Sequence, residues 1–202
     1  MPLTSHMDTY FEIKTDDITC SDRWHLDMPR DAKGIEIDPR VFVHGETYNG
    51  VRPASVAIDA KYPGREVQFN LAAFDMPVVS ASVAGIIANI APASIERFVI
   101  SIPLAQEEYV ILNVTQRARC VDEQRTEYVA KWMSGDMRPD KVGHYKALGG
   151  LQIDPCRTHG LHVFRVEGWV IALVVSERVK LALEKVRDLG VTFVPVTKGD
   201  SE

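Results

Sequence analysis

Apolar and polar residues alternate, or apolar residues form short uninterrupted runs, along most of this chain, which is typical of strands. Helical spacing of apolar residues is clear in two segments only. We therefore predict an α+β fold of mostly antiparallel sheet, with a buried central helix and a C-terminal amphipathic helix. The predicted strands are residues 9–14, 35–37, 41–43, 66–70, 97–103, 108–114, 128–132, 148–153, 161–166, 170–175 and 191–196.

The central helix is predicted to begin after Ser80 or Ser82, either of which can serve as its N-cap, and to stop at Pro92. Its polar face is thin, so we expect it to be covered on more than one side, by the chain itself or by a second copy. The apolar positions at helical spacing are Val83, Ile86, Ile87 and Ile90.

The C-terminal helix is predicted to begin after Ser176, with Glu177 in its first turn, and to end at Gly190. The strand that follows would pack this helix onto the sheet. Its apolar stripe consists of Val179, Leu183 and Val186.

The chain of 202 residues is 46% hydrophobic, enough for one sizeable core. We predict a single domain over residues 8–196, or two packed subdomains with a break near 71–76, and a frayed tail at 197–202. No internal repeat or low-complexity linker is evident. Ser5-His6-Met7 resembles a cloning scar, which would make Met7 the natural start.

The formal net charge of −5 argues against a general nucleic-acid binder, which would usually be basic. The first twenty residues carry four acidic side chains and no apolar run of the kind found in secretory signals, so we expect a cytoplasmic protein. The most apolar segment, 77–91, is shorter than the roughly 20 residues that span a bilayer. We therefore expect neither nucleic acid nor a membrane as a partner.

Motifs for catalysis or cofactor binding are missing from the sequence. There is no phosphate-binding loop, dinucleotide fingerprint, nucleophile elbow or HExxH pair. Cys156, His159 and His162 have a spacing that suits metal ligands, but a fourth ligand is not evident. Cys20 and Cys120 form no CxxC pair with any other cysteine. We predict no catalytic residue, no metal and no cofactor.

Asp122, Glu123, Arg125 and Glu127 form a compact charged cluster. Such a run is most often a solvated turn, but it also suits acid and base groups of a hydrolase or a surface that pairs with charges of a partner.

A second set of candidate contact residues consists of Trp169, Asp16 and Asp17. Trp is over-represented in the energetic centres of interfaces, and Trp169 lies beside Gly168 in a predicted hairpin turn. Of the three tryptophans we expect Trp169 to be the most exposed, and Trp132 to lie in the core. Asp16 and Asp17 open an acidic stretch in the N-terminal third.

Short patterns from Trp24 to Val196 occur in an order that resembles immunity family eleven of bacterial polymorphic toxin systems. Segment 134–146 matches no pattern, and we expect specificity to reside in such variable segments. The patterns are Arg23-Trp24-His25-Leu26 with Pro29, Val41-Phe42 with Gly45, Pro77-Val78-Val79-Ser80, residues 109–114, residues 119–125, Phe164-Arg165, Ser176-Glu177 and residues 190–195.

The resemblance implies a cytoplasmic protein that binds the toxic domain of a cognate effector, for instance an HNH or AHH nuclease, and blocks it by occlusion without catalysis. The toxin-binding candidates are then the charged cluster at 122–127, Trp169, Asp16 and Asp17. Two alternatives stay open. One is a hydrolase that reverses a toxin modification with Asp122, Glu127 or a histidine in 143–162, and the other is a scaffold that forms homo-oligomers through its central helix.

Overall fold

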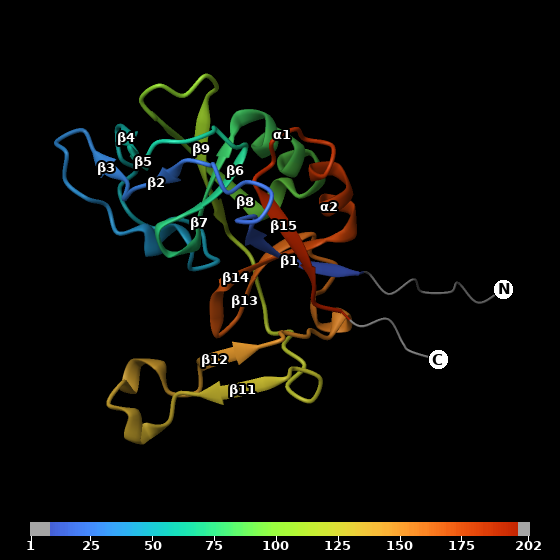
Figure 1. Ribbon diagram of the computed structural model, residues 1–202. Coiled ribbons are helices and arrows are strands. Elements are labelled where there is room, and N and C mark those ends of the chain that lie inside the picture. The colour runs from blue at the N-terminus through green and yellow to red at the C-terminus, as the bar shows by residue number, and fades with distance from the viewer. Residues whose placement is uncertain (1–8, 198–202) are drawn as a thin grey trace.

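The computed structural model describes residues 9–197 and confirms an α+β fold that is rich in strands (Figure 1). Among these residues there are two α-helices, α1 (Ala81–Ile90) and α2 (Glu177–Leu183). The first sheet has the order β6 (Phe69–Ala72), β7 (Met76–Ser80), β9 (Tyr109–Val114), β8 (Ile95–Ile100). The second has the order β10 (Arg117–Ala118), β13 (Val163–Val166), β14 (Trp169–Ser176), β1 (Tyr10–Thr15), β15 (Val191–Pro195).

All strand pairs in these two sheets are antiparallel except β10 with β13. Residues 71–76, near which a subdomain break was considered, belong to the hairpin of β6 and β7 within the first sheet. The two-stranded sheets are β2 (His25–Leu26) with β5 (Ala60–Tyr62), β3 (Arg30–Asp31) with β4 (Val56–Ala57), and β11 (Tyr128–Lys131) with β12 (Tyr145–Gly149).

The two sheets are built on one plan, which the sequence pattern alone does not reveal. In each sheet a hairpin (β6–β7 or β13–β14) is followed by a helix and an edge strand (β8 or β15). The strand between the hairpin and that edge is exchanged: β9 completes the first sheet and β1 completes the second. The fold is thus a structural repeat of two halves, each of which receives its central strand from the start of the other half.

The register supports this relation residue by residue. Ser80, just before α1, pairs with Tyr109, and Ser176, just before α2, pairs with Tyr10. The sequences around the two serines share the pattern Val-Val-Ser-x-x-Val, at residues 78–83 and 174–179. A shared pattern of six residues is too short to reveal the similarity of the halves from sequence alone. The similarity becomes clear from the pairing of the strands.

The two helices lie side by side and share one core with an inner face of each sheet (Figure 1). Ile87 of α1 and Leu183 of α2 occupy equivalent positions, seven residues after their serines, and both are buried in this core. Burial of apolar surface at this centre is the main force that holds the halves together.

Helix α1 is covered on one face, so the predicted cover on more than one side is not found in the described residues. Val83, Ala84 and Ile87 are buried, whereas Ala81, Ser82 and Asn89 are exposed. The Ser80 hydroxyl accepts a hydrogen bond from the Val83 N–H at 3.2 Å, so Ser80 is the cap.

Helix α2 differs from its prediction at both ends. Ser176 precedes the helix, but its hydroxyl lies 3.0 Å from Nδ1 of His162 and does not cap the backbone. The helix ends at Leu183, well before Gly190, which has a φ of 82° at the start of β15. Among the described residues, no helix is long and apolar enough to cross a membrane.

The outer faces of the sheets are covered by two insertions at equivalent points of the repeat. The first insertion, residues 16–68, lies between β1 and β6 and buries residues such as Trp24, Phe42 and Ile58 against the first sheet. The second insertion, residues 115–162, lies between β9 and β13 and buries Cys120 and Ile153 against the second sheet.

Candidate functional site

The most prominent feature of the surface is a hairpin arm, residues 128–149, formed by β11, β12 and the tip between them. Figure 1 shows this arm extending away from the two sheets. Its strands pair with each other and with no other described strand. The tip is closed by hydrogen bonds from the Trp132 N–H to the His144 carbonyl at 2.9 Å and from the Gly143 N–H to the Trp132 carbonyl at 3.1 Å.

Large apolar side chains of the arm face solvent. Met137 is 90% exposed and Met133 is 66% exposed, and Tyr128 and Val142 are exposed as well. A single exposed apolar residue is ordinary on a protein surface, but a group of them on one projecting element marks an interaction surface. Segment 134–146, which matched no sequence pattern, supplies the end of this element.

Trp132 organises the tip rather than the core, so its predicted core position was wrong. Its half-exposed ring is approached by Lys146 Nζ at 4.9 Å, Lys141 Nζ at 5.5 Å and Arg138 Cζ at 5.9 Å. Such contacts between cations and an aromatic face are worth about 0.5–1 kcal/mol each at exposed sites. They give the tip a defined shape although it has little core of its own.

Two carboxylates complete the tip. Asp136 accepts a hydrogen bond from Lys146 Nζ at 2.8 Å and one from the Met133 N–H at 2.8 Å. The ion pair lowers the pKa of Asp136, and a pair with Arg138 likewise lowers that of Asp140. Both carboxylates therefore favour the closed tip while they are ionised.

The charged cluster predicted from the sequence lies at the base of the arm. The Asp122 carboxylate accepts hydrogen bonds from the N–H groups of Gln124 and Arg125 at 3.0 and 3.1 Å, so it shapes the turn that leads into β11. Arg125 and Glu127 are exposed in the same turn.

Glu123 connects that turn to the arm. Its carboxylate lies 2.6 Å from Lys131 Nζ and accepts a hydrogen bond from the Tyr145 hydroxyl at 2.8 Å. Hydrogen bonds from Lys131 and Tyr145 lower the pKa of Glu123, while burial, and then the bond to Glu123, raise the pKa of Tyr145 to about 12. The Glu123 side chain thus links the turn to the hairpin.

Trp169 lies next to the same base. It is half buried at the turn between β13 and β14, and it packs with Tyr145 against the core under the second insertion. The Tyr145 N–H donates to the carbonyl of neighbouring Gly168 at 3.1 Å. Five of the seven predicted contact residues therefore come together where the arm joins the body.

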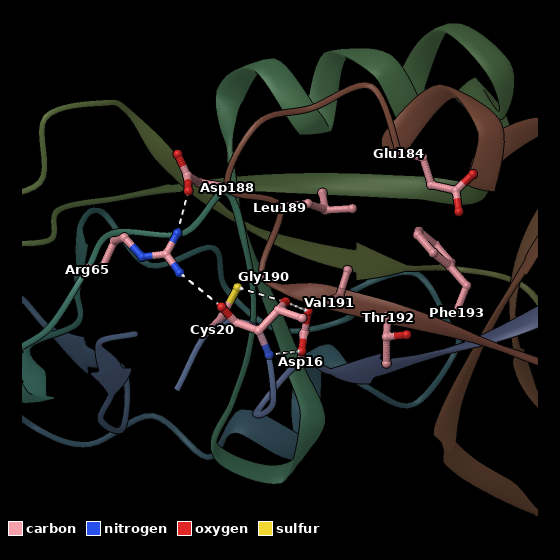
Figure 2. Close-up of a pocket in the computed structure, with 11 residues that line it drawn as sticks. Asp16, Cys20, Arg65, Glu184, Asp188, Leu189, Gly190, Val191, Thr192 and Phe193 are labelled. Carbon is pink, nitrogen blue, oxygen red and sulfur yellow. Dashed lines mark hydrogen bonds and ion pairs between the residues drawn. The ribbon is translucent and has the colours of Figure 1, made fainter. Parts of the chain in front are cut away.

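Asp16 and Asp17 lie elsewhere, in the turn after β1. Asp16 lines a cavity of about 440 Å³ together with Cys20 and Arg65 (Figure 2). Hydrogen bonds from the Thr19 side chain and backbone lower the pKa of Asp16. Asp17 is exposed.

A second cavity of about 830 Å³ shares Arg65 and Asp188 with the first. Arg65 is held on both sides of its guanidinium group: Nε and Nη2 donate to the Asp22 carboxylate at 3.0–3.1 Å, and Nη1 donates to Asp188. Its charge is therefore already compensated. The other ionisable groups in the wall of this cavity are acidic: Asp59, Glu66 and Glu107.

The acidic cavity escaped prediction because its carboxylates come from separate segments with no common pattern. Glu66 accepts a hydrogen bond from the Gln106 N–H at 3.0 Å through one oxygen, and Glu107 accepts one from Gln68 at 3.2 Å. The cavity is suited to a cationic or strongly hydrogen-bonding group.

The sequence Cys156-x-x-His159-x-x-His162 does not converge on one point. His162 bonds to Ser176, and the Cys156 N–H donates to the Asp154 carboxylate at 3.0 Å in a short turn. Within residues 9–197, no group of three or more His, Cys, Asp or Glu side chains could hold a metal ion.

In comparisons with known proteins, no family model and none of the curated proteins matches this chain. The resemblance to an immunity family therefore rests on the ordered patterns in the sequence.

Proposed function

We propose that this protein is a cytoplasmic immunity protein that binds a cognate toxin domain and neutralises it by occlusion. The observation that carries the proposal is the hairpin arm, which presents Met133, Met137 and Val142 to solvent on an element that leaves the body. Exposed apolar groups cost solubility unless a partner covers them, so an arm of this kind is expected in a protein that binds another protein. The resemblance supplies the class of partner.

The arm and its base form one continuous candidate surface. Glu123, Asp122 and Trp169 lie where the arm joins the second sheet, so contact residues predicted from the sequence are neighbours of the exposed tip. A standard interface buries about 800 Å² on each partner, so we expect the contact to include the base of the arm as well as its tip.

The proposal is tested in cells that express the toxin domain encoded immediately upstream. Co-expression of this protein should restore growth, and calorimetry with a catalytically disabled toxin domain should show tight one-to-one binding. Growth arrest that persists despite soluble expression of both proteins would contradict the proposal.

The acidic cavity favours a second candidate, an enzyme that removes a modification made by a toxin. In that case Glu66 and Glu107 would act on the substrate, not the residues at the arm base that the sequence suggested. The double variant Glu66→Gln, Glu107→Gln separates the two candidates. Full protection of cells by this variant supports occlusion, whereas loss of protection with unchanged toxin binding supports catalysis.

A further inference from the structure

We propose that the tip of the hairpin arm is the specificity element, and that it enters an apolar cleft with an acidic rim on the toxin domain. The inference rests on the proposed function and adds which segment recognises the toxin and what chemistry the toxin must offer. It follows from the exposure, the charge and the attachment of the arm.

The shape of the tip argues for insertion into a cleft. The arm projects beyond both sheets, so its end can reach a recess that the broad faces of the protein cannot enter (Figure 1). Met137, at the far turn, has a φ of 54° and is almost fully exposed. Methionine is flexible and polarisable, which suits it to filling an irregular apolar pocket.

The charge of the tip indicates which charge the rim of the toxin cleft should carry. Residues 131–146 hold four Lys or Arg and two Asp, so the arm carries a net positive charge in a protein whose net charge is −5. Arg138 and Lys146 are paired with Asp140 and Asp136, whereas Lys141 has no carboxylate within ion-pair distance among the described residues. Lys141, whose Nζ lies 5.5 Å from the centre of the Trp132 ring, is therefore the cation of the arm that can still pair with an acidic group.

The same pairing argues against a nucleic acid as the occupant. A polyanion is bound by neutralising several phosphates at once, which needs several unpaired cations. Lys131, Arg138 and Lys146 already carry carboxylate partners, and the most exposed large apolar side chains between them are methionines. A protein cleft matches this combination better than a phosphate backbone does.

The test compares two exposed apolar residues in the same backbone conformation. Met137 has a φ of 54° and Leu104, in the connection between β8 and β9, has a φ of 68°. Leu104 is 99% exposed at the rim of the acidic cavity, so its variant also tests whether the toxin binds there instead. Figure 1 shows that connection at the opposite end of the molecule from the arm. Aspartate tolerates this conformation, so Met137→Asp and Leu104→Asp should both fold, which melting curves would verify.

Binding is measured by calorimetry against the catalytically disabled toxin domain from the upstream gene. Met137→Asp should weaken binding by at least about 30-fold, the effect of losing a central contact, and Leu104→Asp by less than about 3-fold. Lys141→Glu should weaken binding strongly at low salt and less at high salt, because exposed charges are screened. Lys33→Glu, in the first insertion, is its control.

The outcomes separate this inference from the proposed function. Wild-type binding with no loss in Met137→Asp and Lys141→Glu would overturn the arm as the specificity element and leave toxin binding intact. An equal loss in Leu104→Asp would overturn it as well. No binding by the wild-type protein would overturn both proposals. Binding of a labelled single-stranded RNA at physiological salt that Lys141→Glu abolishes would overturn the protein cleft as the occupant.

Discussion

The two insertions occupy equivalent points of the repeat but are used in opposite ways. The first insertion is fastened to both halves: Arg23 donates hydrogen bonds to the Gly190 carbonyl and to Asn70, and Trp24 donates to Asn70 at 2.8 Å. The second insertion covers its sheet with its two ends, while its middle leaves the body as the hairpin arm. In a scaffold of two similar halves, one insertion thus stabilises the body and the other leaves the body exposed for the contact that we propose.

The same substitution in each insertion should show the largest contrast. Trp24→Ala removes a buried ring that packs edge-on against Tyr109, and it should cost about 3–5 kcal/mol. Trp132→Ala removes the three cation contacts of the tip, but β11 and β12 pair with no other described strand. The loss should therefore loosen the arm locally and cost less than about 1 kcal/mol of global stability. Urea denaturation of both variants measures the difference. Similar losses would mean that the arm folds as part of the core.

The halves themselves should respond alike. Ile87→Ala and Leu183→Ala remove equivalent side chains from the shared core, and each should cost about 2–5 kcal/mol. Leu181→Ala, on the exposed side of α2, is the matched control and should cost little. If the halves unfold together, fluorescence and circular dichroism will report one transition in every variant. Two separate transitions would show that the halves are independent subdomains.

Two glycines should reveal how firmly each insertion is attached. A Cβ on Gly190 would lie 2.6 Å from Val67 Cβ of the first insertion, whereas a Cβ on Gly168 would lie 3.3 Å from the Tyr145 ring at the arm base. Both glycines have positive φ, as does Gly34, where a Cβ would meet no atom within 4 Å. Gly34→Ala therefore measures the backbone cost alone, about 1 kcal/mol.

Gly190→Ala should lose more than about 2 kcal/mol of unfolding free energy, because Val67 is buried and cannot move aside. Gly168→Ala should stay near the value of Gly34→Ala but raise hydrogen exchange in residues 128–149, since Tyr145 is half exposed and can shift. Equal costs for Gly190 and Gly168 would contradict the difference in attachment.

Local patterns missed β7 and β10, and they predicted a strand at 41–43 where a 3-10 helix covers Pro39–Phe42. They were sufficient to predict most other strands of the two large sheets and the start of α1, because alternation and the Ser80 cap are encoded in adjacent residues. They failed where a distant residue decides. Ser176 bonds to His162 from another strand, so it does not cap α2. Trp132 is a large apolar residue at a strand end, but the strand belongs to an arm with no sheet above it.

The candidate site could likewise be predicted only in part. The charged cluster at 122–127 and Trp169 were named from residue type, and the fold places them together at the arm base. The acidic cavity could not be predicted, because Asp59, Glu66 and Glu107 meet only through pairings between separate segments. The exchange of β1 and β9 likewise leaves no trace in local sequence.

The smallest effect that we expect is on pH dependence: as the pH is lowered, the arm should lose order before the body does. Ion pairs lower the folded pKa values of Glu123 and Asp136 from the ordinary 4.5 and 3.8. A carboxyl whose folded pKa is depressed stabilises the fold above its ordinary pKa, and this contribution is lost as the pH falls through the folded value. The arm should therefore be ordered at pH 6 and loosen as the pH falls below about 4.

Backbone amide chemical shifts of residues 128–149, followed from pH 7 to pH 2, measure this loosening. The variant Glu123→Gln, Asp136→Asn should show the acid-like shifts of the arm already at pH 6, because its arm has lost the two ionised partners of Lys131 and Lys146. Asp38→Asn breaks a comparable exposed pair with Arg40 in the first insertion and should leave the arm unchanged. Arm shifts that stay constant down to pH 2 would show that Trp132 and the backbone pairing alone hold the arm closed.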